Sequence, residues 1–245
     1  MFGIQEAHFQ KKGQIKFQSS DKYQIYELTR ERRGGGGLAL GVKKCLNPIW
    51  LKSGNDQCEA LTVQISMENL DIRITNAYGP QNYDDGHKKV EFWAYLENEV
   101  NISNQSNVGC IIMFDANSWL GYYFLCSDPN PQNENGKIFE DFLERNKNMT
   151  LLNSHPSCQG FITRSRIVKN KEERSIIDFI LICDKILPYF QKMFIYEEKT
   201  WALTNFRGKE AKRPAVKSDH NVLKANFCIK YKRIKIQSRK TIFII

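Results

Sequence analysis

The sequence lacks several features that mark large classes of proteins. No apolar run approaches the roughly 18 residues of a membrane-spanning helix, so none is expected. The chain does not open with a charged segment, an apolar one and a small-residue cleavage site, which favours an intracellular protein over a secreted one. Its glycine run, Gly34–Gly37, is not followed by Lys and then Ser or Thr. We therefore expect a turn between two strands there rather than a phosphate-binding loop.

The cysteines show no pairing pattern. Seven are scattered along the chain, none in a Cys-x-x-Cys pair and none grouped with histidine at zinc-site spacing. This argues against a disulfide framework or a structural zinc, so we expect all seven to be reduced thiols. With 245 residues, 41% of them hydrophobic, the chain can bury a substantial core, and a soluble globular fold is expected.

The positive charge is concentrated at one end of the sequence. The net charge is +9, and the segment Arg207–Ile245 contains 12 Lys or Arg residues but only two acidic ones. A basic segment of this kind suggests a polyanionic partner such as nucleic acid. A solvated tail is the alternative.

Hydrophobic periodicity predicts a mixture of strands and helices. Continuous apolar runs at Val108–Phe114 and Ile176–Cys183 are typical of strands covered on both faces. Apolar residues at helical spacing predict helices within 90–100 and 136–148. Hairpins mixed with helix–strand units indicate a mixed α/β fold. Shorter strands are expected at 24–29, 38–42, 61–65, 72–74, 151–152, 221–223 and 226–229, with a turn at Met67–Leu70.

Two acidic residues end or interrupt the long apolar runs. Asp115 directly follows the first run, where a carboxylate costs several kcal/mol unless a metal, a histidine or backbone N–H groups pair with it. An Asx turn that closes the strand and includes Asn117 is the structural alternative. Asp178 lies inside the second run and also needs a partner. A cap or a salt bridge with Arg174 is the alternative there.

Polar residues also stand at the ends of other predicted strands. Asp219 and His220 precede the last strands, and on an extended backbone their side chains would point to opposite faces. Asp178 could then accept a hydrogen bond from the His220 ring, while Asp219 faces a metal or an amide. Tyr78 and Gln81 follow a hairpin, where a tyrosine hydroxyl could hold a phosphate oxygen. A core tyrosine with a satisfied hydroxyl is the alternative.

Glu6 adds another acid after the apolar residues Phe2–Ile4. Taken together, these side chains supply hard oxygen ligands and one imidazole, which suit Mg²⁺ or Mn²⁺ better than zinc. With a basic surface, the pattern favours metal-assisted attack of water on a phosphate ester.

The order of these residues resembles the endonuclease/exonuclease/phosphatase superfamily. The resemblance extends from Phe2 to about Ile229, and within the superfamily it is greatest to the apurinic-type endonuclease domain of non-LTR retrotransposons. That finer likeness rests on the glycine-rich turn at 33–37, Tyr-Gly-Pro-Gln at 78–81 and Asp-Ala-Asn-Ser-Trp-Leu-Gly at 115–121. The five stretches that carry the superfamily resemblance are Gln5-Glu6, Asn76–Pro80, Asp115–Asn117, Ser175–Asp178 and Ser218–His220.

The resemblance implies a four-layered α/β sandwich of two packed mixed β-sheets flanked by helices, with the site at one edge. By it, Glu6 and Asp219 would ligate Mg²⁺ or Mn²⁺, and Asp219 would also assist leaving-group contacts. Asp115 would position or deprotonate the attacking water, which Asn117 would hold. The resemblance also implies that Tyr78 would bind the scissile phosphate. His220, oriented by Asp178, would stabilise charge on the phosphoryl oxygens.

Substrate contacts are also implied by the resemblance. Gln81 and Ser175 would bind the substrate, and Arg164, Arg166 and Lys169 would lie in a loop near it, making mostly sequence-independent phosphate contacts. The implied partner is the DNA phosphate backbone, with no membrane and no small-molecule cofactor. We expect a monomer, once fused to a reverse transcriptase, that acts in the nucleus if genomic DNA is its substrate.

The expected organisation is one catalytic domain, 1–230, and a basic C-terminal tail, 231–245. The first strand of the family, which carries an Asn, has no counterpart before Gln5, so we expect that strand to be truncated. Two other functions stay open. One is a catalytically impaired nucleic-acid-binding remnant, and the other is a superfamily phosphatase that acts on another phosphoester.

Overall fold

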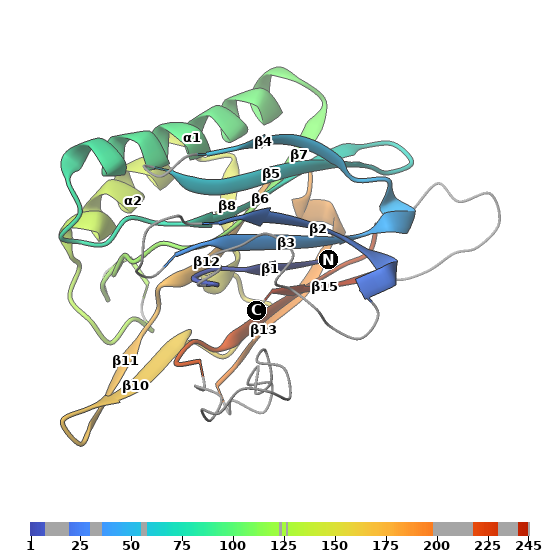
Figure 1. Ribbon diagram of the computed structural model, residues 1–245. Helices are drawn as coiled ribbons and strands as arrows, with labels where there is room; N and C mark the ends of the chain where they lie inside the picture. Colours follow the sequence, from blue (N-terminus) through green and yellow to red (C-terminus); the bar gives the residue numbers. More distant parts are fainter. Residues whose placement is uncertain are drawn as a thin grey trace.

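Figure 1 shows a computed structural model of the chain. The structure describes residues 1–7, 20–29, 36–54, 58–122, 124–125, 127–197, 218–229 and 240–244. These residues form a mixed α/β fold with two α-helices, α1 (Gly86–Gln105) and α2 (Glu134–Arg145), and four sheets. Within these ranges no helix is both long and apolar enough to span a membrane.

The central sheet has six strands in the order β4–β5–β6–β7–β12–β8. β6 and β7 are parallel, with α1 as the connection between them, and every other neighbouring pair is antiparallel. The sheet is therefore mixed, as the alternation of hairpins and helices predicted. Its strands are β4 (Ile49–Ser53), β5 (Glu59–Ser66), β6 (Asp71–Tyr78), β7 (Val108–Asp115), β12 (Asp178–Cys183) and β8 (Met149–Leu151).

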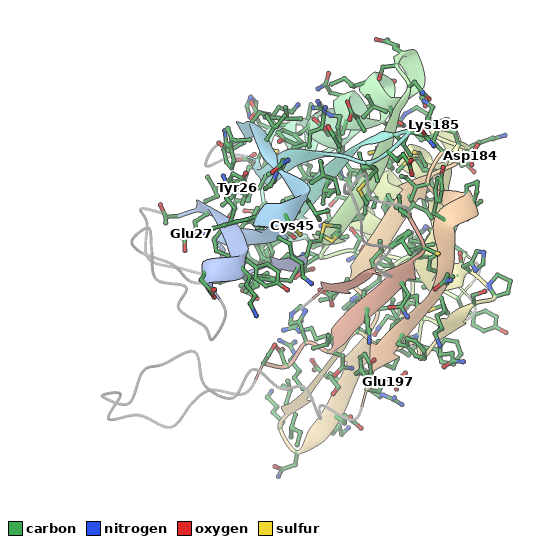
Figure 2. All side chains as sticks on the ribbon, turned by 90° about the vertical axis from the view of Figure 1, so that its right-hand side faces the viewer. Tyr26, Glu27, Cys45, Asp184, Lys185 and Glu197 are labelled. Atoms are coloured by element: carbon green, nitrogen blue, oxygen red, sulfur yellow. The ribbon has the colours of Figure 1, made fainter. Side chains whose placement is uncertain are left out.

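A second layer of strands faces one side of the central sheet, and both helices lie on the other side (Figure 1). The second layer contains a sheet in the order β1–β3–β2 and another in the order β15–β14–β13–β9, with β1 beside β15. In Figure 2, Tyr26 of β2 and Glu197, just after β13, lie far apart in this layer. The described residues thus form three of the four predicted layers. The strands of the second layer are β1 (Phe2–Ile4), β2 (Tyr23–Leu28), β3 (Leu38–Lys43), β9 (Cys158–Gln159), β13 (Phe190–Tyr196), β14 (Val222–Phe227) and β15 (Lys240–Ile244).

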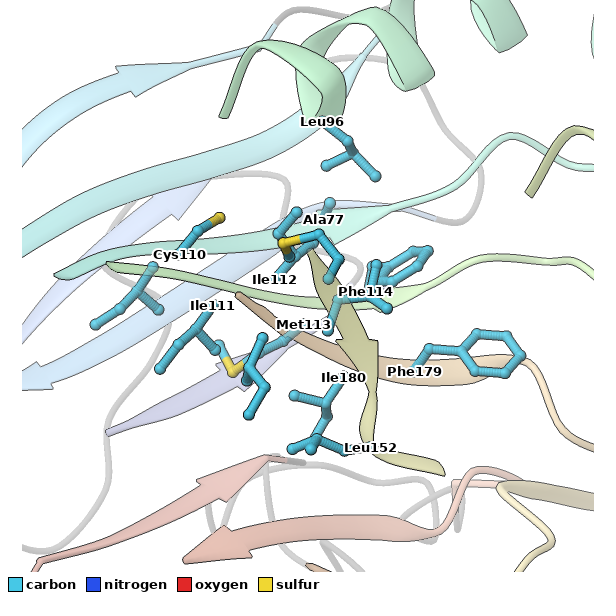
Figure 3. Close-up of a cluster of buried hydrophobic side chains, with 14 of the residues drawn as sticks. Ala77, Leu96, Cys110, Ile111, Ile112, Met113, Phe114, Leu152, Phe179 and Ile180 are labelled. Atoms are coloured by element: carbon cyan, nitrogen blue, oxygen red, sulfur yellow. The ribbon is translucent and has the colours of Figure 1, made fainter. Parts of the chain in front are cut away.

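The central strands are apolar on both faces because both faces are covered. On the helix side, the ring of Phe114 packs 5.3 Å from that of Phe139 in α2. On the other side, Met113 lies against Gly3 of β1. Figure 3 shows the same arrangement, with Leu96 of α1 above β7 and Leu152 below it. This confirms the prediction drawn from the continuous apolar run in β7.

Two predictions about the C-terminal part of the chain need correction. The strands expected at 221–223 and 226–229 are one strand, β14, because Lys224 and Asn226 lie on its more exposed face and do not interrupt pairing. The segment predicted as a tail, 231–245, contains β15, which pairs antiparallel with β14. The rest of that segment, 231–239 and Ile245, lies outside the described residues.

The cysteines that the structure describes form no disulfide, as expected. Cys110 and Cys183 are buried in the central sheet, where the backbone N–H of Cys110 donates to the Cys183 sulfur at 3.1 Å. Cys126 lies outside the described residues.

A buried ion cluster joins α1 to the central sheet. Glu99 of α1 is 0% exposed, and its carboxylate accepts two hydrogen bonds from Arg73 of β6, at 2.8 and 3.0 Å. Lys52 of β4 lies 2.8 Å from the same carboxylate. The bidentate guanidinium contact compensates the cost of removing the carboxylate from water.

Substitution of Glu99 tests this compensation. Glu99→Ala leaves the Arg73 guanidinium buried without its partner, so we expect the free energy of unfolding to fall by about 3–5 kcal/mol. The matched control is Glu91→Ala on the same helix, whose partly exposed carboxylate lies 3.7 Å from His87, with an expected loss under about 1 kcal/mol. Urea denaturation measures both, and equal losses would contradict the assignment.

Candidate active site

Four polar side chains lie at the same level on four neighbouring strands of the central sheet. Glu59 is directly opposite Tyr78, and Tyr78 is opposite Asp115. Asp115 is in turn opposite Asp178. Side chains opposite each other on paired strands point to the same face. Because Phe114, next to Asp115, packs against α2, this polar row faces the second layer of strands.

The second layer adds two side chains to the polar row. Glu6 lies two residues after the end of β1, and His220 lies two residues before β14. One possible ligand atom from each of Glu6, Asp115 and His220 lies within 4.8 Å of the others. The Nδ1 atom of His220 lies 3.0 Å from both carboxylate oxygens of Asp178, which is the pairing predicted from the sequence. The site therefore brings together residues from both ends of the chain.

Glu6, Asp115 and His220 could hold a divalent cation. Asp115 is 2% exposed, and burial, followed by the charge of Asp178, raises its pKa to about 7. Two neighbouring buried carboxylates are stabilised by a positive charge placed between or beside them. The two carboxylates fit a divalent cation that prefers oxygen ligands, and a neutral His220 ring would add one nitrogen ligand.

His220 supplies positive charge to the same cluster. Burial alone would lower the pKa of its imidazole, but the neighbouring carboxylates outweigh burial, with Asp178 contributing most. Together with Asp115 and Asp219 they raise the pKa of His220 to about 10. These carboxylates therefore favour the protonated ring, whose Nδ1–H donates to Asp178.

Tyr78 is held between two other predicted site residues. Gln81 Nε2 donates to the Tyr78 hydroxyl at 2.7 Å, and the hydroxyl donates to Glu6 Oε1 at 3.3 Å. Burial, followed by the charges of Asp115 and Glu6, raises the pKa of Tyr78. Tyr78 is thus a neutral donor at the edge of the cluster, and Gln81 contacts it directly.

Asn117 adopts a left-handed backbone conformation just after β7, with a φ of 47°. Its N–H donates to Asp115 Oδ1 at 2.9 Å, so the Asx turn considered as an alternative is present. Its side-chain Nδ2 donates to the carbonyl of Gly79 at 2.9 Å. Asn117 therefore fixes Asp115 and joins the loops that follow β6 and β7.

Asp219 lies beside the cluster rather than among its three possible metal ligands. Its Oδ2 accepts a hydrogen bond from Arg164 Nε at 2.7 Å, which lowers the pKa of Asp219 despite partial burial. The prediction that Asp219 and His220 point to opposite faces is wrong, since Asp219 Oδ1 lies 3.9 Å from His220 Nε2. The reason is that β14 begins only at Val222, so the backbone at these residues is not a regular strand.

The remaining predicted substrate residues lie on a hairpin, not in a loop. β10 (Arg164–Val168) and β11 (Lys171–Ser175) pair antiparallel and project from the body (Figure 1). Lys169 and Asn170 form its turn with φ of 49° and 62°, the signs that tight hairpin turns require. Arg164 and Ser175 oppose each other at its base.

The outer half of the hairpin is exposed. Arg166 pairs with Glu173 at 2.7 Å, on the neighbouring strand. Arg174, considered as a partner of Asp178, instead pairs with Glu197 at 2.8 Å. The hairpin therefore brings Arg164 to the cluster and leaves Arg166 and Lys169 further out along the strands.

Two residues that support the site were given no role by sequence reasoning. Asn76 is fully buried and donates to the carbonyls of Ile4 and Ala39, at 3.0 and 2.9 Å, which ties the central sheet to the second layer. Glu59 begins β5 and is buried in the polar row. The sequence could have indicated a site role for Asn76, because it is a polar residue two positions before Tyr78 and therefore lies on the same face of the strand. Nothing local marks Glu59.

No protein-family model matches the chain, and no curated protein matches its sequence. Solved structures match it at low sequence identity. The endonuclease domain of TRAS1, a telomere-specific non-LTR retrotransposon, is 16% identical with a TM-score of 0.55, over 87% of this chain and 82% of that one. An AP endonuclease from Archaeoglobus fulgidus is 14% identical with a TM-score of 0.56, over 92% and 87%.

A third match is the 3′ phosphatase NExo from Neisseria, bound to a product DNA hairpin. It is 14% identical with a TM-score of 0.58, over 92% of this chain and 87% of that one. These similarities confirm the predicted resemblance at the level of the fold: the chain shares the fold of these endonuclease and phosphatase structures.

Proposed function

We propose that this chain is a Mg²⁺-dependent phosphodiesterase that nicks DNA and derives from the endonuclease domain of a non-LTR retrotransposon. The observation that carries the proposal is the convergence of Glu6, Asp115 and His220, with Asp178 bonded to the histidine ring. Two of the matched structures support the substrate, since one is a retrotransposon endonuclease domain and another is bound to DNA. Mn²⁺ is the alternative metal.

Each residue of the cluster has a distinct role in this proposal. Glu6 and Asp115 hold Mg²⁺, which when bound polarises a phosphoryl oxygen. Asp115 also accepts a proton from the attacking water as a general base. With substrate bound, Tyr78 turns its hydroxyl hydrogen from Glu6 to the scissile phosphate. Protonated His220 stabilises charge on the phosphoryl oxygens.

The surrounding residues position the substrate. Asn117 and Asp178 orient the general base and His220 through the contacts described above. Asp219, held by Arg164, assists contacts with the leaving group. Basic side chains on the projecting hairpin, Arg166 and Lys169, contact DNA phosphates without reading sequence. A monomer in the nucleus is the setting that fits a genomic DNA substrate.

A plasmid-nicking assay tests the proposal. Supercoiled plasmid is incubated with the purified chain and Mg²⁺, and conversion to the open circle is followed by gel electrophoresis. We expect Asp115→Asn and His220→Gln each to slow nicking by about 100-fold or more, because each removes a group that stabilises the transition state. Asp141→Asn on the exposed face of α2 is the matched control and should nick as the wild type does.

The outcomes separate the candidate functions. Nicking that EDTA abolishes and both variants lose supports the proposal. Equal nicking by the wild type and both variants would exclude this site as its source. A chain that releases phosphate from a 3′-phosphorylated oligonucleotide without nicking would be a phosphatase instead. DNA binding without any hydrolysis would identify a nucleic-acid-binding remnant.

The role of Asp178 predicts a shift in pH dependence. Asp178→Asn removes the largest favourable charge and the hydrogen bond to the ring, so the pKa of His220 should fall below its value of about 10. The charged ring exists only below that pKa. As the pH is raised, the variant should therefore lose activity at a lower pH than the wild type does. NMR titration of the histidine ring carbons measures the shift, with His220→Gln assigning the resonance. An unchanged pKa would contradict the role.

A further inference from the structure

The backbone of Glu6 needs external support. Its φ is 50°, in the left-handed region that residues with a Cβ atom rarely adopt. Conformations of this kind persist where the surrounding structure fixes them. Glu6 also lies beyond the pairing of β1 with β3, whose last matched pair is Ile4 and Ala39. The position of the Glu6 carboxylate therefore depends on what holds the chain just after β1.

Glu59 holds that part of the chain through one intermediate residue. The N–H of Ala7 donates to the carbonyl of Gly37 at 2.9 Å. The N–H of Gly37 in turn donates to Glu59 Oε2 at 2.7 Å, and Glu59 is 6% exposed. A short series of hydrogen bonds thus runs from a buried carboxylate in the central sheet to the residue next to Glu6.

The glycine turn is shaped around this carboxylate. Gly36 has a φ of 106°, and a Cβ atom there would lie 2.6 Å from a Glu59 oxygen. Only glycine allows the carboxylate to lie against the turn in this way. A turn was expected at Gly34–Gly37, and the structure describes two of its residues, Gly36 and Gly37. Both contact the Glu59 carboxylate.

A second contact reaches Glu6 from the same row of side chains. Tyr78, directly opposite Glu59, donates its hydroxyl hydrogen to Glu6 Oε1. Tyr78 thus contacts the side chain of Glu6, whereas Glu59 fixes the adjoining backbone through Gly37. Two neighbouring residues of one row hold the same carboxylate from different directions.

We infer that Glu59 is a positioning residue that sets the affinity of the site for its divalent cation by fixing Glu6 through Gly37. The inference rests on the proposed metal-dependent function, in which Glu6 is a ligand. Residues that orient a ligand typically change metal affinity by about 10–100-fold when they are replaced. Glu59 touches neither substrate nor metal in this scheme.

Direct measurement of Mn²⁺ binding tests the inference without relying on activity. Mn²⁺ is titrated into the metal-free chain, and the free ion is followed by its electron paramagnetic resonance signal. We expect Glu59→Ala and Glu59→Asp to weaken binding by about 10-fold or more, since neither can reach Gly37. Glu59→Gln keeps an acceptor oxygen and should stay within about threefold of the wild type. Glu59→Asp retains the charge and serves if Glu59→Ala does not fold.

The control is a buried carboxylate of α1, which packs on the opposite side of the central sheet. Glu99→Gln disturbs stability on the helix side of the sheet and should leave Mn²⁺ affinity unchanged. Wild-type affinity in Glu59→Ala and Glu59→Asp would overturn the inference, as would an equal loss in Glu99→Gln. Failure of the wild type itself to bind Mn²⁺ would instead overturn the proposed metal-dependent function, and the inference with it.

Discussion

Asp115 and Asp178 lie directly opposite each other on paired strands, and the rest of the site depends on this placement. Like charges at opposed positions of a sheet repel, and burial of Asp115 makes the repulsion stronger. The protonated ring of His220 relieves part of it by bonding to Asp178. This leaves Asp115 as the carboxylate with a raised pKa, facing Glu6 across the gap between two layers of strands.

The backbone near Asp115 and Asp178 directs the possible ligand side chains toward the space between the two layers of strands. Glu6 and Asn117 both adopt left-handed conformations two residues after the end of a strand, one in each layer. Such conformations cluster at functional sites because the surrounding hydrogen bonds can fix a side chain in a direction that a regular strand does not allow. Here Asn117 N–H fixes Asp115, and Ala7 N–H fixes the chain behind Glu6. The site is therefore built from strand ends rather than from strand interiors.

The sequence indicated the parts of this arrangement that are local. The apolar run before Asp115 predicted a strand covered on both faces, and the helical spacing around Trp93 and Phe139 predicted the covering helices. The pairing of Asp178 with His220 could be anticipated because each needed a partner. The contact of Arg164 with Asp219 and the position of Glu59 depend on strand register, which no single segment specifies. The hairpin β10–β11 was missed because its charged residues carry no apolar alternation.

A buried carboxylate lies on each side of the central sheet, and the two are neutralised in different ways. On the helix face, Glu99 is neutralised by Arg73 and Lys52, cations that belong to the fold and stay in place. On the other face, the positive groups near Asp115 are His220, which is already engaged by Asp178, and Arg164, which is engaged by Asp219. A carboxylate with fixed cations contributes to stability alone. One whose charge is only partly balanced favours an exchangeable cation, and this difference separates Glu99 from Asp115, the carboxylate that we propose as a metal ligand.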